Sequence, residues 1–102
     1  MLIRDKDKKA IVDIAKSSIR HPSKVLAYGS RVDGTAHETS DLDLVIVSDL
    51  NENVDIGEFM DFKQKLKESN IPIVVQVLDW NRIPKSFHEN ILSNFIELVH
   101  IK

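Results

Sequence analysis

Residues 28–47 read YGSRVDGTAHETSDLDLVIV, and the rest of the chain is organised around this stretch. It opens with Gly29-Ser30, directly after the apolar run 25–28. It closes with Asp41 and Asp43, which lead into a second apolar run, residues 44–47. Short apolar runs bounded by turn residues are typical of buried strands. The stretch therefore predicts two strands joined by a polar loop, with a possible short helix inside the loop.

Asp41 and Asp43 are two residues apart, and side chains at that spacing on a strand point to the same face. Their carboxylates can therefore converge on one point, where they would repel each other unless a cation lay between them. Carboxylate oxygens are ligands that Mg²⁺ prefers, especially when substrate phosphates complete its coordination shell. Taken alone, the Ser-Asp-Leu-Asp sequence would suit a turn into an edge strand equally well. The Gly-Ser pair upstream favours the metal site.

The Gly29-Ser30 pair has the complementary chemistry. Glycine lets the backbone approach a ligand closely, and free backbone N–H groups at a turn or helix start bind phosphate. The Ser30 hydroxyl could cap the short helix or donate to a phosphate oxygen. A phosphate site and a metal-binding acid pair within one short segment indicate nucleotidyl transfer.

The motif Gly29-Ser30-Arg31, Gly34 and then residues 40–44 (SDLDL) resembles the G-S-x-x-x-G…S-D-x-D-L signature of the polymerase-beta nucleotidyltransferase superfamily. The size and the flanking pattern are most similar to the minimal nucleotidyltransferase (MNT) subgroup, and the resemblance extends through Leu78-Asp79-Trp80-Asn81. It implies that Gly29 and Ser30 contact the terminal phosphates of a nucleotide. It also implies that Asp41 and Asp43 are the catalytic, metal-binding acids.

Two more residues of the motif are nucleotide-binding candidates. Arg31 could meet a phosphate, bidentately where the geometry allows, or form a salt bridge with a local acid such as Asp33 or Glu38. Ser40 could orient the first carboxylate or cap the entry to the strand. Gly34 is expected to supply a backbone conformation that other residues resist.

The remaining patterns complete an α/β fold. Apolar residues at helical spacing predict a first helix over roughly 5–20 and another over about 56–69. The second helix has Ile56, Phe59, Met60 and Leu66 as apolar positions, and Phe59 and Met60 are expected to be core residues and not cofactor contacts. Residues 71–78 are rich in β-branched side chains and predict a third strand. Pro84 suits the first turn of a last helix, and residues 96–101 a short strand or extended tail. We expect one domain, 1–102: an α+β two-layer sandwich with a mixed β-sheet and helices packed on one face.

The third strand departs from the family pattern. Active members carry a third acid there, and on that alignment the position is occupied by Gln76. A glutamine can offer a carbonyl oxygen to a metal but no charge, and it cannot act as a general base at neutral pH. Asp79 is three positions on, so on a regular strand it faces the opposite side. A bulge could rotate it inward; otherwise Asp79 ends the strand or caps the following turn.

Composition excludes several other classes of protein. The chain has 102 residues, no cysteine and a net charge of −2, so disulfides, thiolate zinc sites and thiol catalysis are excluded. It lacks the basic footprint of a dedicated nucleic-acid-binding surface. No apolar run approaches the roughly 18 residues of a membrane span, and no signal peptide is visible. We therefore expect a cytoplasmic protein.

The expected function is Mg²⁺-dependent transfer of a nucleoside monophosphate, AMP from ATP, to a hydroxyl. The chain is short for an enzyme that binds its acceptor alone, so a second chain should complete it. The resemblance implies that partner: MNT proteins pair as antitoxins with helical HEPN toxins, in some pairs by adenylylating a toxin tyrosine. The alternative is a catalytically impaired protein that neutralises a HEPN partner by binding alone, which Gln76 favours.

Overall fold

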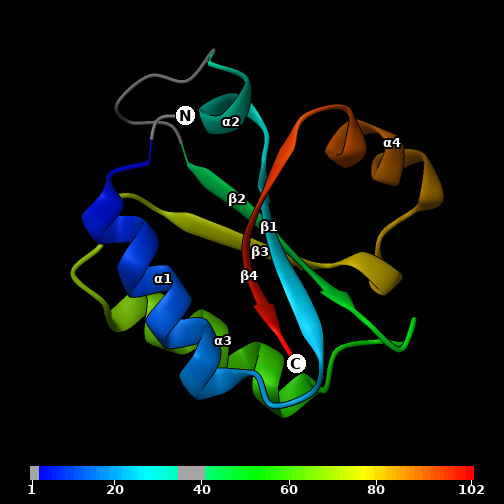
Figure 1. Ribbon diagram of the computed structural model, residues 1–102, viewed down its shortest axis with the longest axis horizontal. Coiled ribbons are helices and arrows are strands. Elements are labelled where there is room, and N and C mark those ends of the chain that lie inside the picture. The colour runs from blue at the N-terminus through cyan, green and yellow to red at the C-terminus, as the bar shows by residue number, and fades with distance from the viewer. Residues whose placement is uncertain (1–2, 35–40) are drawn as a thin grey trace.

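The computed structural model describes residues 3–34 and 41–102. Its elements, in chain order, are α1 (Asp5–Ser18), β1 (Ser23–Tyr28), α2 (Ser30–Asp33), β2 (Leu42–Ser48), α3 (Ile56–Glu68), β3 (Val75–Asp79), a 3₁₀ turn (Trp80–Arg82), α4 (Lys85–Ser93) and β4 (Phe95–Ile101). The strands form one sheet with helices around it (Figure 1). Within the described residues, no helix has the length and apolar character needed to cross a membrane.

The sheet is mixed, with the strand order β3-β2-β1-β4. β1 pairs antiparallel with both β2 and β4, whereas β3 runs parallel to β2. The predicted α+β class with a mixed sheet is therefore confirmed. Residues 95–101, which could have been a tail, are a full strand of the sheet beside β1.

The larger core lies between the sheet and the pair α1 and α3. Ile11 and Phe62 are completely buried there, facing Val25, Leu44 and Ile46 of the central strands. Burying one such side chain stabilises the fold by about 1.5–3 kcal/mol. Fewer of the apolar side chains of α3 are buried than its sequence suggests.

The expected core role of Met60 is wrong, because Met60 and Ile56 are 55% and 58% exposed. The buried positions of α3 are Phe62 and Leu66, four residues apart on one face. Met60 lies on a different face of the helix, where no sheet covers it.

α4 packs on the opposite face of the sheet. Strand alternation places Leu26, Tyr28 and Val45 on that face, and α4 covers them with the buried Ile91. The Phe87 ring meets the Tyr28 ring edge-to-face, with centroids 6.1 Å apart. α1 and α3 lie on one face of the sheet, as expected. α4 lies on the opposite face, which differs from the expectation, because β1 and β2 are apolar on both sides. Pro84 immediately precedes this helix instead of lying in its first turn.

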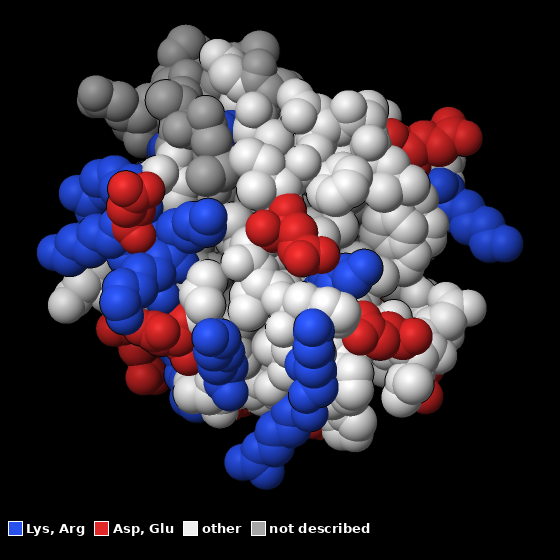
Figure 2. All heavy atoms as spheres, in the orientation of Figure 1, with Lys and Arg blue, Asp and Glu red and all other residues white. Residues whose placement is uncertain are grey.

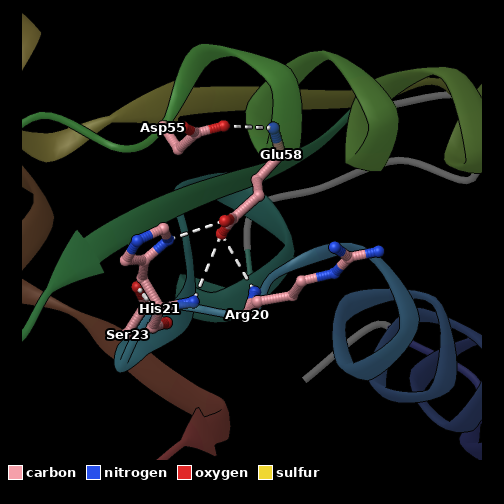
Figure 3. Close-up of polar contacts among 5 residues, drawn as sticks. All are labelled: Arg20, His21, Ser23, Asp55 and Glu58. Carbon is pink, nitrogen blue, oxygen red and sulfur yellow. Dashed lines mark hydrogen bonds and ion pairs between the residues drawn. The ribbon is translucent and has the colours of Figure 1, made fainter.

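A carboxylate fixes the start of α3 against the turn between α1 and β1 (Figure 3). The Asp55 side chain caps α3 by accepting from the backbone N–H of Glu58, at 3.0 Å. The Glu58 carboxylate accepts from the backbone N–H groups of Arg20 and His21, at 2.9 and 3.3 Å, and lies 2.6 Å from His21 Nδ1. These contacts join two segments that are nearly 40 residues apart in sequence.

Candidate functional site

Three cross-strand neighbours form a row on the α4 side of the sheet. Asp43 on β2 is in register with Tyr28 on β1 and with Gln76 on β3. Residues directly opposite each other on neighbouring strands point to the same face. Asp41, two residues before Asp43, lies on that face too, just ahead of β2. The sheet therefore brings Asp41 and Asp43 together, and adds Gln76 and Tyr28 beside them.

Gly29 places the backbone against Asp43. Its φ and ψ are 85° and −158°, a region that is essentially restricted to glycine. A Cβ on Gly29 would lie 2.6 Å from Asp43 Oδ2, which is closer than side chains tolerate. The backbone conformation thus favours glycine strongly, and any larger residue would also displace the Asp43 carboxylate. Gly29 and Asp43 therefore lie side by side in the fold.

α2 begins at Ser30 directly after this glycine. The backbone N–H of Val32 donates to the carbonyl of Gly29 at 3.0 Å, and that of Gly34 donates to the carbonyl of Ser30 at 3.1 Å. Gly34 ends the helix in the left-handed conformation, with φ 88° and ψ 6°. The predicted short helix and the special backbone at Gly34 are both confirmed.

Burial and nearby negative charge raise the pKa values of two groups at the site, Asp43 and Tyr28. Burial raises the pKa of Asp43, and the nearby Asp41 charge raises it further. Burial also raises the pKa of Tyr28 to about 12, with a second contribution from the charge on Asp43. Each of these shifts reflects unfavourable negative charge, which a bound cation would relieve.

Gln76 interacts directly with one of the two acids. Its Nε2 donates a hydrogen bond to Asp41 Oδ2 at 2.8 Å. The amide thus supplies a hydrogen-bond donor to the acid pair and no negative charge. Sequence reasoning identified the position but not this contact, which depends on the register of β3 against β2.

Asp79 lies apart from this site and has a structural role. The residue is 3% exposed. Its carboxylate accepts from the backbone N–H groups of Val54 and Asn81, at 2.9 and 3.1 Å, and from Arg82 Nε at 3.0 Å. The prediction that it ends the strand and caps the following turn is confirmed, and no bulge turns it towards Asp41.

The remaining nucleotide-binding candidates are Arg31, Ser30 and Ser40. Arg31 is 6% exposed and already interacts within the folded chain. Ser30 is half-buried. Ser40 lies outside the described residues, so its predicted role stays a prediction.

The site offers few protein ligands for Mg²⁺. Among residues 3–34 and 41–102, no group of three or more His, Cys, Asp or Glu side chains could hold a metal ion. The site instead offers two carboxylates on one face, beside a glycine backbone. That set fits a hard cation that takes oxygen ligands from the protein and from substrate phosphates together. It does not fit an all-protein metal cage.

Almost the whole sequence matches one protein family. Residues 9–102 match the family described as "Polymerase beta, Nucleotidyltransferase", and the chain belongs to this family. It is also 39% identical, over 72 residues, to the probable protein adenylyltransferase MntA of Haemophilus influenzae. That alignment covers 71% of this chain and 61% of the relative, so the chain spans less than two thirds of the relative's length.

Solved structures share the fold. A toxin–antitoxin structure with AMP-PNP has a TM-score of 0.74 at 18% identity, covering 91% of this chain and 73% of that one. A tri-AMPylated Shewanella oneidensis HEPN toxin in complex with its MNT antitoxin has a TM-score of 0.66 at 14% identity, covering 90% and 68%. At these identities the likeness concerns the fold.

Proposed function

We propose that the chain is a nucleotidyltransferase that moves AMP from ATP to a protein hydroxyl, with Mg²⁺. The observation that carries this is the close approach of Gly29 to Asp43. A Cβ added to Gly29 would lie 2.6 Å from Asp43 Oδ2. This approach supports a phosphate site at the Gly29-Ser30 turn, next to the two carboxylates. Family membership and the adenylyltransferase relative support the same reaction.

In this proposal Asp41 and Asp43 hold the metal, and the Gly29-Ser30 backbone holds the terminal phosphates. A bound Mg²⁺ would polarise the phosphoryl oxygens and neutralise charge as it develops. The acceptor oxygen forms a bond to the α-phosphorus, the bond from that phosphorus to the bridging oxygen breaks, and pyrophosphate leaves. Gln76 cannot accept the proton of the acceptor hydroxyl, so that proton passes to one of the two aspartates or to solvent.

We further propose a HEPN-type protein as the acceptor, and an antitoxin role for this chain. The support is the relative named as a protein adenylyltransferase and the neighbouring structure in which an MNT antitoxin is bound to an AMPylated HEPN toxin. The adenine base is supported by the AMPylated toxin of that neighbouring structure, and the tyrosine acceptor is what the family resemblance implies.

The test is transfer of label from α-labelled ATP to a purified HEPN-type partner, with Mg²⁺. Wild type should label the partner, and Asp41→Asn combined with Asp43→Asn should not. The matched control is Asp49→Asn, an exposed acid just beyond the far end of β2, which should label like wild type. Labelling that survives the double substitution would contradict the proposal.

A second candidate function is neutralisation of the partner by binding alone. Gln76 favours it, because the amide donates to Asp41 where a third carboxylate would bind metal. The two candidates are separated by Gln76→Asp in the same assay. Labelling only after this substitution would support the binding protein, and labelling by wild type would support the transferase.

A further inference from the structure

The direction of attack follows from the arrangement of the strands, if the proposed function is right. Attacking and leaving oxygens of a phosphoryl transfer lie roughly in line. The leaving pyrophosphate would lie at Gly29-Ser30, at the end of β1, and the α-phosphate at Asp41 and Asp43 beside β2. The acceptor hydroxyl must then arrive from the other side, over β3. Since β3 is the outermost strand of the sheet, the acceptor reaches the site across this edge.

A groove lies at this edge of the sheet. It has a volume of about 550 Å³ and lies between the second half of α3 and residues 71–75. Val74 forms part of its wall, and the Val74 carbonyl accepts from the backbone N–H of Leu42 at 2.9 Å. Leu42 directly follows Asp41, so the groove and the site meet at this edge of the sheet, with the groove on the α3 face and the carboxylates on the α4 face.

The groove exposes apolar side chains that the fold does not use. Val74 and Met60 are 63% and 55% exposed, which makes them two of the most exposed large apolar residues in the described chain. Pro72 and Ile73 extend the same wall. Exposed apolar side chains gathered around one concavity are typical of a surface that another molecule covers.

Positive charge flanks the groove. Lys63 and Lys67 line it from α3, with Lys63 Nζ 5.3 Å from the centre of the Phe59 ring. Figure 2 shows Lys and Arg over α1 and α3 with Asp and Glu among them, whereas the area over the connection between α4 and β4 is mostly uncharged. The groove therefore suits a segment with apolar side chains and acidic residues beside them.

We propose that this groove docks the acceptor protein, and so presents its hydroxyl to Asp41 and Asp43 from the β3 edge. The occupant is a segment of that protein with an apolar face and acidic flanks. The apolar part contacts Met60 and Val74, and the acidic part contacts Lys67. The groove then determines which protein is modified, while the Gly29 turn and the aspartates determine the chemistry.

The experiment measures two affinities for each variant: that of a purified HEPN-type protein and that of AMP-PNP with Mg²⁺, both by calorimetry. Met60→Asp and Lys67→Glu change the groove on exposed positions, so they should leave the fold intact. Each should weaken binding of the HEPN-type protein by about tenfold, the effect of one good interface contact. Affinity for AMP-PNP should remain within about twofold of wild type.

The control is Leu92→Asp. Leu92 is 53% exposed on α4, so it matches Met60 in exposure and apolar character but lies away from the groove, on the face of the sheet that carries Asp41 and Asp43. It should change neither affinity. Weaker partner binding by Leu92→Asp with no effect of the groove variants would overturn the proposal, as would wild type that does not bind the HEPN-type protein. Loss of AMP-PNP binding in the groove variants would assign the groove to the nucleoside instead.

These outcomes are separable from failure of the proposed function. Wild type that binds the HEPN-type protein through the groove but binds no AMP-PNP would retain the docking surface and remove the transferase.

Discussion

Gln76 donates a hydrogen bond to Asp41 across the β2–β3 pair, at 2.8 Å. The amide partly offsets the crowding of Asp41 and Asp43, and leaves the site with two negative charges in place of three. Replacing Gln76 with an acid therefore tests whether the site needs a cation to balance its negative charges.

Gln76→Asp should make stability depend strongly on Mg²⁺. A third carboxylate next to Asp41 costs about 1 kcal/mol without metal, which is about 4–8 °C in Tm for a domain of this size. Saturating Mg²⁺ should recover that loss, because the metal binds the folded state only. Thermal unfolding with Mg²⁺ and with EDTA measures both effects.

The matched control for that experiment is Gln64→Asp. Gln64 is also an exposed glutamine whose Nε2 donates to a carboxylate, that of Glu68, but it lies on α3 away from the site. Its Tm should not respond to Mg²⁺. An equal Mg²⁺ response in both variants would contradict the placement of Gln76 in the metal site.

Gly29→Ala should damage both the fold and the site. The backbone conformation costs about 1–3 kcal/mol for a residue with a Cβ, and that Cβ would press on Asp43 Oδ2. We expect a lower Tm together with weaker AMP-PNP binding. Gly34→Ala separates the two effects, because Gly34 also has positive φ but no atom of the described residues lies within 4 Å of its added Cβ. Gly34→Ala should lower Tm alone, and equal loss of nucleotide binding in both variants would count against the Gly29–Asp43 contact.

Asp79→Ala should destabilise the fold without touching the nucleotide site. The substitution leaves a buried backbone N–H at Val54 without its acceptor and removes the partner of Arg82. The expected loss is about 3 kcal/mol in free energy of unfolding, read by urea denaturation. AMP-PNP affinity, measured where the variant is folded, should equal that of wild type. A stable variant that no longer binds nucleotide would make Asp79 a site residue.

Glu58 should give the stability a dependence on pH in the acid range. Burial opposes the charge of its carboxylate, but hydrogen bonds from Arg20 N and His21 N and the contact with His21 Nδ1 outweigh burial and lower its pKa from 4.5 (Figure 3). A lowered pKa in the folded state adds stability above the unfolded value, and this stability is lost as the pH falls through the folded value.

Glu58→Gln should therefore cost about 2 kcal/mol at pH 7, and the difference from wild type should shrink below pH 4.5. Urea denaturation at several pH values measures this. Glu89→Gln, an exposed acid on α4, is the control and should stay close to wild type throughout. A difference that stays constant down to pH 3 would contradict the assignment.

The order of elements was predictable because each has a local signal. Periodic apolar residues marked α1 and α3, and the Gly-Ser and Asp-x-Asp patterns marked the turn and the start of β2. Placement of Asp79 followed from strand alternation alone. These are properties of neighbouring residues, which a sequence displays directly.

Long-range pairing was not predictable in the same way. Nothing local places β4 beside β1, or α4 on the face opposite α1, because both depend on which apolar surfaces remain uncovered. The Gln76–Asp41 hydrogen bond depends on the register between β2 and β3. The exposure of Met60 depends on where α3 rests on the sheet. These features required the assembled fold.

The most direct test of the account is the affinity for AMP-PNP, with Mg²⁺ and with EDTA, in wild type, Asp43→Asn and Asp49→Asn. This measurement needs no knowledge of the acceptor. The account predicts that wild type and Asp49→Asn bind only with Mg²⁺, and that Asp43→Asn binds about 100-fold more weakly, since even outer-shell partners of a metal are worth 10–100-fold. Equal binding with EDTA, or binding unchanged by Asp43→Asn, would contradict a nucleotide–metal site at Asp41 and Asp43.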